Sequence, residues 1–310
     1  MATRTAGDEI EDRGPGPFVT HRVQRLPGVG HLVTSSRRHR KGLRPHRVSD
    51  AASAERPRPT RAHAFRHLWA PGRLAWWIAI LFTLGAALFT LGGIGAAWPG
   101  SLPPPLRPGL VLNRVFAVGA VFFTSAAWLQ WLEALNGDVA DAFRDAAPRR
   151  WRWFGWRPRN LGYLASAVQL AGTLMFNVDT LDALLSGLSW EEEDLLVWTP
   201  NMSGCACFLV ASYLAYVEVS QRAVGFAVRS VSWWIAVANL SGSVAFQISA
   251  LYAFVGPSDA APEAIFRAGL YTAAGGACFL VGSYLMIPEL ADEDEAPGAL
   301  TASKDPRTEC

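Results

Sequence analysis

The sequence predicts an all-α fold, a polytopic membrane bundle of six transmembrane helices preceded by a basic N-terminal region. Hydrophobic residues make up 51% of the 310 residues and charged residues only 17%, which is unusual for a soluble domain. The apolar residues gather in windows of roughly 20 residues, the length that a helix needs to cross the hydrocarbon core. Six windows meet this length: residues 74–98, 110–133, 161–184, 195–217, 231–255 and 265–287.

The fourth window carries the weakest signal. Pro200 and Asn201 interrupt its outer end, whereas residues 202–217 continue without a charge. Membrane helices tolerate proline where neighbouring groups satisfy the freed backbone. We therefore predict a span here as well.

The N-terminal region, residues 1–68, holds 14 of the 28 Lys and Arg residues and all six His residues. Its abundance of Arg, His, Pro and Ala predicts a disordered cytoplasmic segment without a packed core. Contact with anionic lipid headgroups explains its charge with fewer assumptions than nucleic-acid binding does. Residues 291–310 are predicted to form an acidic cytoplasmic tail.

Loop charges predict the orientation, because Lys and Arg stay on the cytoplasmic side of a membrane. The third loop is purely acidic over residues 191–194, whereas the second and fourth loops are rich in arginine. Both termini are therefore predicted to lie in the cytoplasm, with the protein in a cell membrane, expected to be a bacterial inner membrane. The loop arginines, which we expect to contact anionic headgroups, are Arg144, Arg149, Arg150, Arg152, Arg157, Arg159, Arg222 and Arg229.

Three helical pairs repeat along the chain, over residues 69–135, 156–220 and 226–290. The first helices of the pairs share a glycine and a phenylalanine at constant offsets, and the second helices share a glycine, a phenylalanine and a closing glutamate. Each unit has an even number of spans, so the sequence predicts three parallel repeats around an axis along the membrane normal. The recurring residues are Gly85, Gly172, Gly242, Phe89, Phe176, Phe246, Gly119, Gly204, Gly275, Phe123, Phe208, Phe279, Glu133, Glu218 and Glu289.

Two stretches of the third unit, NLSGSVAF at residues 239–246 and GGACFLVGSYL at residues 275–285, resemble the YrhK-like membrane hairpin. Residues 169–176 and 204–214 are similar to the same motif. The resemblance covers residues 163–290 best and fits the first pair loosely. That family is uncharacterised, so the resemblance implies a hairpin fold and no activity.

The residue types that are missing exclude several kinds of chemistry. No histidine follows residue 67, and the only lysines are Lys41 and Lys304. The membrane region therefore lacks a histidine base, a histidine metal ligand and a Schiff-base lysine. Cys205 and Cys207 would point to different faces of a helix, which does not suit a shared metal. We expect no enzyme, no cofactor and no metal site.

The repeated glutamates Glu133, Glu218 and Glu289 are the main candidate site. Threefold symmetry would place their carboxylates in one layer at the cytoplasmic ends of the helices, where they could attract cations. The simpler interpretation is that each glutamate ends its helix at the headgroup boundary and pairs with an arginine of a neighbouring loop. The sequence favours this second interpretation, because a carboxylate at the interface costs less than one at the midplane.

A second candidate is a polar intramembrane layer formed by Gln169, Asn177, Asn239 and Gln247. Hydrogen bonds between helices explain these amides, and a polar lining for a solute path is the alternative. Asp179 and Asp182, together with residues 191–194, could form an outer mouth that attracts cations, although a solvated acidic loop explains them as well. The six repeated glycines are predicted to allow close helix packing.

Two functions therefore stay open. The sequence favours a non-catalytic bundle that acts as a scaffold or binds a protein partner or a second copy, because it carries few midplane charges. The alternative is a small-solute or ion transporter or channel along the pseudo-threefold axis. An axis filled by phenylalanine and leucine would exclude this alternative.

Overall fold

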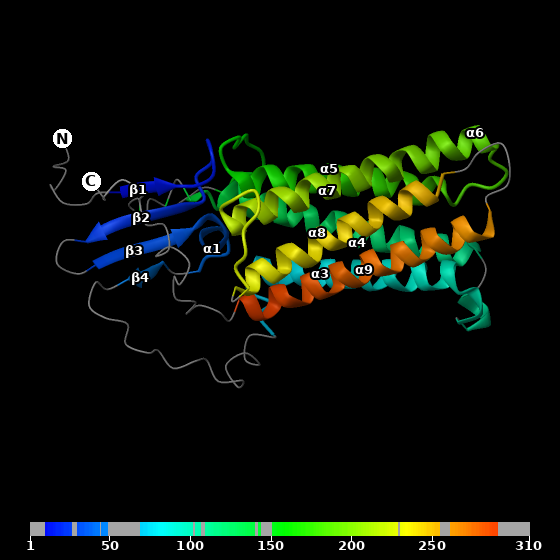
Figure 1. Cartoon of the computed structure of the whole chain (residues 1–310), viewed down its shortest axis with the longest axis horizontal. Helices are drawn as coiled ribbons and strands as arrows, with labels where there is room; N and C mark the ends of the chain where they lie inside the picture. The colour runs from blue at the N-terminus through cyan, green and yellow to red at the C-terminus, as the bar shows by residue number, and fades with distance from the viewer. Residues whose placement is uncertain are drawn as a thin grey trace, which may run out of the picture.

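The computed structural model describes residues 10–26, 30–43, 45–48, 69–101, 103–106, 109–139, 142–143, 151–228, 230–254 and 261–290. Six of its helices are long and apolar enough to cross a membrane, which confirms the predicted bundle (Figure 1). These helices are α3 (Leu74–Ala97), α4 (Gly109–Asn136), α5 (Leu161–Asp182), α7 (Thr199–Ser220), α8 (Val231–Tyr252) and α9 (Pro262–Glu289). Two short 3-10 helices, η1 (Pro99–Ser101) and η2 (Pro104–Leu106), lie between α3 and α4.

The fourth span is longer than predicted. It begins at α6 (Trp190–Glu193), continues through the π-helical turn η4 (Asp194–Trp198) and joins α7, which gives 31 helical residues in all. Pro200 causes no break because it directly follows the wide π-helical turn, in which the Thr199 backbone N–H bonds to the Asp194 carbonyl oxygen five residues back. The Thr199 hydroxyl donates a hydrogen bond of 2.9 Å to the Asp194 carbonyl oxygen across the wide turn.

The six helices form a closed ring in which each packs on its neighbours along the chain, and α9 returns to α3. Small residues close this last contact. A Cβ added to Gly93 would lie 2.4 Å from the backbone nitrogen of Ala273, and one added to Gly276 would lie 2.7 Å from that of Thr90. Larger side chains would force α3 and α9 apart, so these glycines hold the ring closed.

The repeated glycines lie where the two helices of each hairpin are closest. A Cβ on the first helix's glycine would lie 3.0 Å from a carbonyl oxygen of the second helix in all three hairpins. Such short distances need glycine, because the helix backbones themselves are in contact. The three contacts join Gly85 to Gly119, Gly172 to Gly204 and Gly242 to Gly275.

Six phenylalanines fill the space inside the ring, one from each helix. Phe89, Phe176 and Phe246 form a triangle with ring centroids 5.8–6.4 Å apart. A second triangle has centroids 5.5–5.9 Å apart and consists of Phe123, Phe208 and Phe279. Each ring of one triangle also contacts a ring of the other, at 5.0–5.4 Å. The six side chains are buried, so these two phenylalanine layers form the centre of the core.

The N-terminal residues form a small antiparallel sheet at one end of the bundle (Figure 1). Its strands follow one another in the order β1 (Ile10–Arg13), β2 (His21–Leu26), β3 (Gly30–Ser35) and β4 (His46–Val48). The helix α1 (Ser36–Arg40) follows β3 directly and lies between the sheet and the helix ends. We call the described residues from 10 to 48 the head, and the end of the bundle that α1 contacts the head end.

The prediction of disorder is wrong for the head. Val23 and Val33 pair across β2 and β3, and both are buried. Apolar and polar residues alternate in these strands, but the basic composition of the whole region 1–68 hid this local pattern. The other predicted disordered residues, 1–9 and 49–68, and the acidic tail over 291–310 lie outside the described residues.

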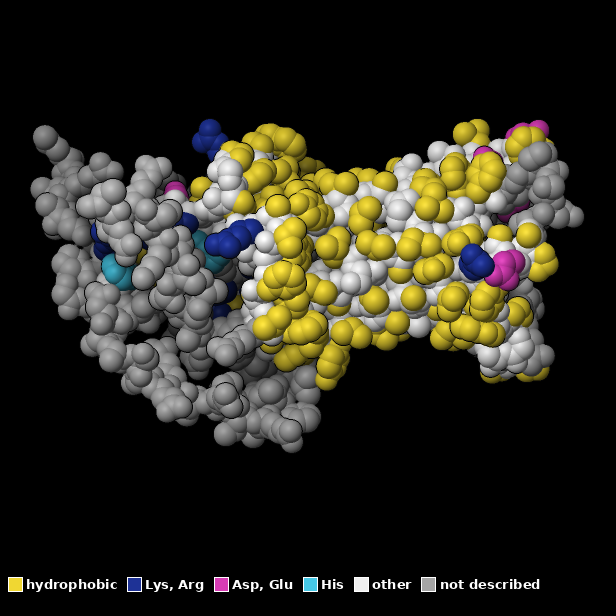
Figure 2. Space-filling model, in the orientation of Figure 1, with side chains coloured by type: hydrophobic (Ala, Val, Ile, Leu, Met, Phe, Trp, Pro, Cys, Tyr) yellow, Lys and Arg dark blue, Asp and Glu magenta, His cyan; other side chains and the backbone are white. Residues whose placement is uncertain are grey.

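The outer surface of the bundle suits a lipid environment. In Figure 2 hydrophobic side chains cover the visible face along its length, whereas the few charged side chains lie towards the two ends. Exposed tryptophans mark the head end, where amphipathic rings favour the headgroup layer. They include Trp69, Trp77, Trp153, Trp156 and Trp234.

Candidate functional site

The helix α1 carries its polar side chains at helical spacing into the head end of the bundle. Its N-cap is Ser35, whose side-chain oxygen accepts a hydrogen bond of 3.2 Å from the Arg38 backbone nitrogen. Residues four apart share one face of a helix. Ser36 and Arg40 therefore point to one carboxylate, and Arg37 and Lys41 point to another.

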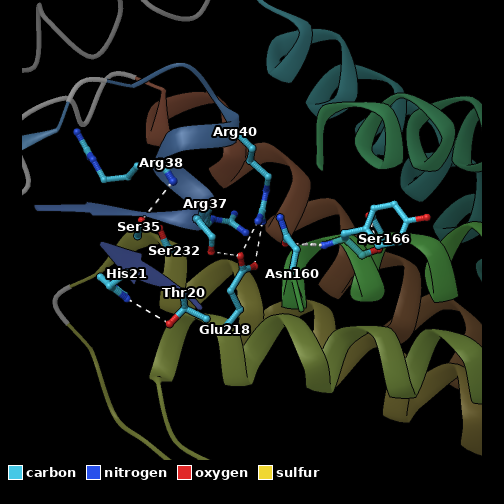
Figure 3. A network of polar contacts seen from close by, with 12 residues as sticks. Thr20, His21, Ser35, Arg37, Arg38, Arg40, Asn160, Ser166, Glu218 and Ser232 are labelled. Atoms are coloured by element: carbon cyan, nitrogen blue, oxygen red, sulfur yellow. Dashed lines mark hydrogen bonds and ion pairs between the residues drawn. The ribbon is translucent and has the colours of Figure 1, made fainter. Parts of the chain in front are cut away.

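Glu218, near the end of α7, binds the first of these pairs. The Arg40 guanidinium donates two hydrogen bonds to its carboxylate, Nη1 to Oε1 at 2.5 Å and Nη2 to Oε2 at 3.0 Å. The Ser36 hydroxyl donates a further bond to Oε1. The side chains of Arg40 and Glu218 are only 6% and 2% exposed. Figure 3 shows Arg40 reaching Glu218 from the head. This is a buried bidentate ion pair, the geometry that arginine favours.

Glu289, at the end of α9, binds the second pair. The Arg37 guanidinium donates from Nε to Oε1 at 2.6 Å and from Nη2 to Oε2 at 2.9 Å, and the Lys41 ammonium also donates to Oε2. The Ser232 hydroxyl at the start of α8 adds a bond of 2.5 Å to Oε1. Two cations and a hydroxyl from two parts of the chain therefore satisfy this carboxylate.

Glu133, at the end of α4, is the third member of the carboxylate layer and is buried like the other two. Its carboxylate interacts electrostatically with the cations of Arg37 and Lys41. The end of α4 also contacts α1 directly, because a Cβ added to Gly137 would lie 2.3 Å from the Arg40 Cα. The structure thus brings all three repeated glutamates to one short basic helix. The cations that bind Glu218 and Glu289 belong to the head.

Arg37, Arg40 and Lys41 form ion pairs with two of the three carboxylates, those of Glu218 and Glu289. The carboxylates lie at the C-terminal ends of α4, α7 and α9, where the helix dipoles are also negative. An acidic layer of this kind attracts cations strongly when it is shielded from water. Removing one partner of a buried pair leaves an uncompensated charge, which is costly. The head and the bundle are therefore coupled through this cluster.

Gly162 makes room for the Arg40 guanidinium. A Cβ at this position of α5 would lie 2.1 Å from Arg40 Nη1 and 2.8 Å from Glu218 Oε1. We expect Gly162→Ala to displace the guanidinium and expose α1, although alanine favours a helix by about 1 kcal/mol over glycine. Trypsin cleavage within residues 36–41, followed by mass spectrometry, measures this exposure. Gly72→Ala is the control, because nothing lies within 4 Å of its added Cβ; equal cleavage rates in the two variants would contradict the assignment.

Burial and the neighbouring Arg37 guanidinium lower the pKa of Lys41 from 10.5 to about 8, against the opposing pull of Glu289. Between these two pH values the unfolded chain holds a proton that the folded chain has lost, so the Lys41 contribution to stability rises with pH. We expect the unfolding free energy of the wild type, relative to Lys41→Met, to rise between pH 7 and pH 10 by up to about 3 kcal/mol. Thermal unfolding across this range measures the difference, and a constant or falling difference would refute the prediction.

A cavity of about 40 Å³ lies between the phenylalanine layers and the ion-pair cluster. Phe82 and Phe279 line one side, and Glu218 and Arg40 line the other. It has room for about three water molecules. The remaining polar lining comes from Arg37, Gln130, Gln169, Ser212, Asn239 and Ser283.

The four amides of the predicted polar layer divide into two kinds. Asn177 donates a hydrogen bond of 2.7 Å to the Thr124 hydroxyl of α4, and Gln247 donates one to the Met202 sulfur of α7. These two amides join adjacent helices. Gln169 and Asn239 line the cavity instead.

The residues of the predicted acidic outer mouth differ in exposure. Asp179 is buried and Asp182 half-buried on α5, whereas Glu191, Glu192 and Glu193 are exposed on α6. No three His, Cys, Asp or Glu side chains come together as a metal site within the described part of the chain. Cys205 is buried and donates a hydrogen bond of 3.4 Å to the Phe246 carbonyl oxygen, so it packs between α7 and α8.

Sequence reasoning missed the head's contribution to this site: Ser36, Arg37, Arg40 and Lys41. One signal was present, because positions 36 and 40, like 37 and 41, are spaced for one helix face and follow a serine suited to cap a helix. Nothing in the sequence indicated which carboxylates these side chains would reach.

No family model, curated protein or solved structure matches the chain. The class of protein rests on the fold itself. Six long apolar helices define a multi-pass integral membrane protein. The buried ion-pair cluster with the head is its candidate functional site.

Proposed function

We propose that the protein is a non-catalytic, non-transporting membrane component, a scaffold whose six-helix bundle holds the head at one end. The two phenylalanine layers carry this proposal. Their rings contact one another within and between the layers, which leaves no room for a hydrated ion on the axis. The acidic layer is occupied by cations of the head, which removes the other element of a conduction path.

The three hairpins are proposed to be parallel repeats around the membrane normal, similar to the YrhK-like hairpin. The equivalent glycine contacts and the two triangles support this arrangement, because each position is filled by the same residue type from each hairpin. A duplicated hairpin forms such a ring naturally.

The head end is proposed to face the cytoplasm of a bacterial cell. Arg152, Arg157 and Arg222 lie in loops at this end, and the opposite end carries the acidic helix α6. The arginines and the exposed tryptophans would then contact anionic headgroups. Reporter fusions after residue 155 and residue 226 are expected to report a cytoplasmic location, and an external location for either would reverse the orientation.

Ion flux into proteoliposomes tests the proposed function. The wild type is expected to pass K⁺, Na⁺ and protons no faster than empty liposomes. The variant R37M/R40M/K41M removes the three cations that bind Glu218 and Glu289 and serves as the decisive comparison. It too is expected to show no flux, because the phenylalanine layers remain.

The alternative is a channel that the head closes, and the three buried carboxylates at the head end favour it. Flux in the triple variant but not in the wild type would support this alternative. Flux in the wild type would reject the scaffold proposal outright.

A further inference from the structure

The cavity beneath the ion-pair cluster has an unusual combination of walls. Phe82, Ile235 and Phe279 supply apolar surface, whereas Gln130 and Gln169 supply amides. Phe82, Gln169 and Asn239 occupy equivalent positions of the three repeated units, so two units place an amide where the first places a ring. An empty cavity is normally lined by apolar groups, whereas this cavity receives polar side chains from different helices.

One amide of this lining, that of Asn239, retains an unused hydrogen-bond acceptor. Among the described residues its buried Oδ1 has no hydrogen-bond partner, and it lies beside Gly282 of α9. The two hydroxyls of the lining, in contrast, already have hydrogen-bond partners. Ser212 pairs with Ser243 at 2.8 Å, and Ser283 donates a hydrogen bond of 2.8 Å to the Phe279 carbonyl oxygen. A buried amide oxygen without a partner is costly, because it has lost its hydrogen bonds to water.

The side of the cavity that Arg40, Glu218 and Gly162 line indicates which ligand chemistry the site accepts. Arg40 presents its guanidinium there, held by both oxygens of Glu218, and Gly162 leaves the space that the planar group needs. Arg40 is delivered by a short helix of the head and is not part of the bundle itself. The bundle alone therefore supplies a carboxylate, amides and aromatic surface, a set that suits a small planar cation.

We propose that Glu218 and the adjoining cavity form a binding site for small guanidinium compounds, and that Arg40 occupies this site as an intramolecular ligand in the present structure. A free guanidinium compound would replace Arg40 on Glu218 and place a short alkyl group against Phe82 and Phe279. Because the same contact docks α1, binding would release the head. This inference goes beyond the scaffold function, since the site does not need a path across the membrane.

Titration of the detergent-purified full chain with ethylguanidinium chloride tests the site, with thermal stability as the readout and equal ionic strength kept with NaCl. Arg40→Ala is expected to show saturable stabilisation, and R40A/E218Q none. The wild type is expected to need a concentration at least about tenfold higher, because Arg40 competes from within the chain. Equal responses of R40A and R40A/E218Q would overturn the proposal.

A second measurement uses the wild type, so the test does not depend on the folding of a variant. Low millimolar ethylguanidinium is expected to speed trypsin cleavage within residues 36–41, whereas NaCl and tetramethylammonium chloride at the same ionic strength are not. Equal cleavage in all three salts would overturn the proposal. Neither measurement depends on flux, so failure here is distinct from failure of the scaffold function.

Discussion

Arg40→Met is expected to lower the free energy of unfolding by about 3–5 kcal/mol, because it leaves the Glu218 carboxylate buried without its cation. The two side chains are only 6% and 2% exposed, so water would not replace the guanidinium. The same variant is expected to expose α1 to trypsin. Thermal and denaturant unfolding in detergent measure the first effect, and cleavage within residues 36–41 measures the second.

The double variant R40M/E218M provides the control for this prediction. Replacing a whole buried pair by apolar side chains of similar volume is often neutral, so it is expected to recover most of the stability that Arg40→Met loses. Arg13→Met is the matched surface control, because its ion pair with Glu11 is largely exposed and such pairs contribute about 0.2–1 kcal/mol. A similar loss for Arg13→Met and Arg40→Met would contradict the importance of the buried cluster.

Phe123→Ala is expected to have the second large effect, a loss of about 3–5 kcal/mol. Its ring is 1% exposed and contacts Phe82, Phe89, Phe208 and Phe279. The site is buried inside the ring, so the substitution leaves a cavity in the layer of Phe123, Phe208 and Phe279, next to Phe89 of the other layer. Thermal unfolding in the same detergent measures the loss.

Phe226→Ala is the matched control for the phenylalanine layers, because its side chain is 81% exposed. We expect this substitution to change stability by a small fraction of the Phe123→Ala effect. If both variants melted at the same temperature, the two layers would not be the core that holds the ring together.

The spans were predictable from the sequence because length and hydropathy alone determine whether a helix can cross a bilayer. The fourth span meets the same criteria of length and hydropathy despite Pro200. This proline falls at the start of α7, and the π-helical turn before it extends the helix back to Trp190. The repeated phenylalanines were visible as aligned positions. That they meet as two triangles follows from closure of the ring, which the sequence does not specify.

The head was not predictable by the same means. Its strands are three to six residues long, and their alternation is weak against the basic composition of residues 1–68. The ion pairs join residues about 180 to 250 positions apart in sequence, and local patterns do not report such contacts. The loop arginines looked like sufficient partners for the glutamates, although the structure uses Arg37 and Arg40.

The cluster also departs from the symmetry of the bundle. The single helix α1 interacts with three equivalent carboxylates. Its two pairs of side chains bind Glu218 and Glu289 directly. Glu133 is left to the longer-range field of the same cations. α1 has only five residues and provides two such pairs of side chains, so the threefold symmetry of the bundle does not extend to the head.

Thiol cross-linking between the head and α7 tests most directly whether the head docks on the bundle through its cations. Thr20 donates a hydrogen bond to the Gln221 side chain, so T20C/Q221C places two thiols at this contact. The four native cysteines, Cys205, Cys207, Cys278 and Cys310, are first replaced by alanine. In intact membranes a short bismaleimide is expected to join residues 20 and 221 within one chain, and R37M/R40M/K41M is expected to abolish the link. Absence of the link, or its persistence in the triple variant, would contradict ion-pair docking of the head.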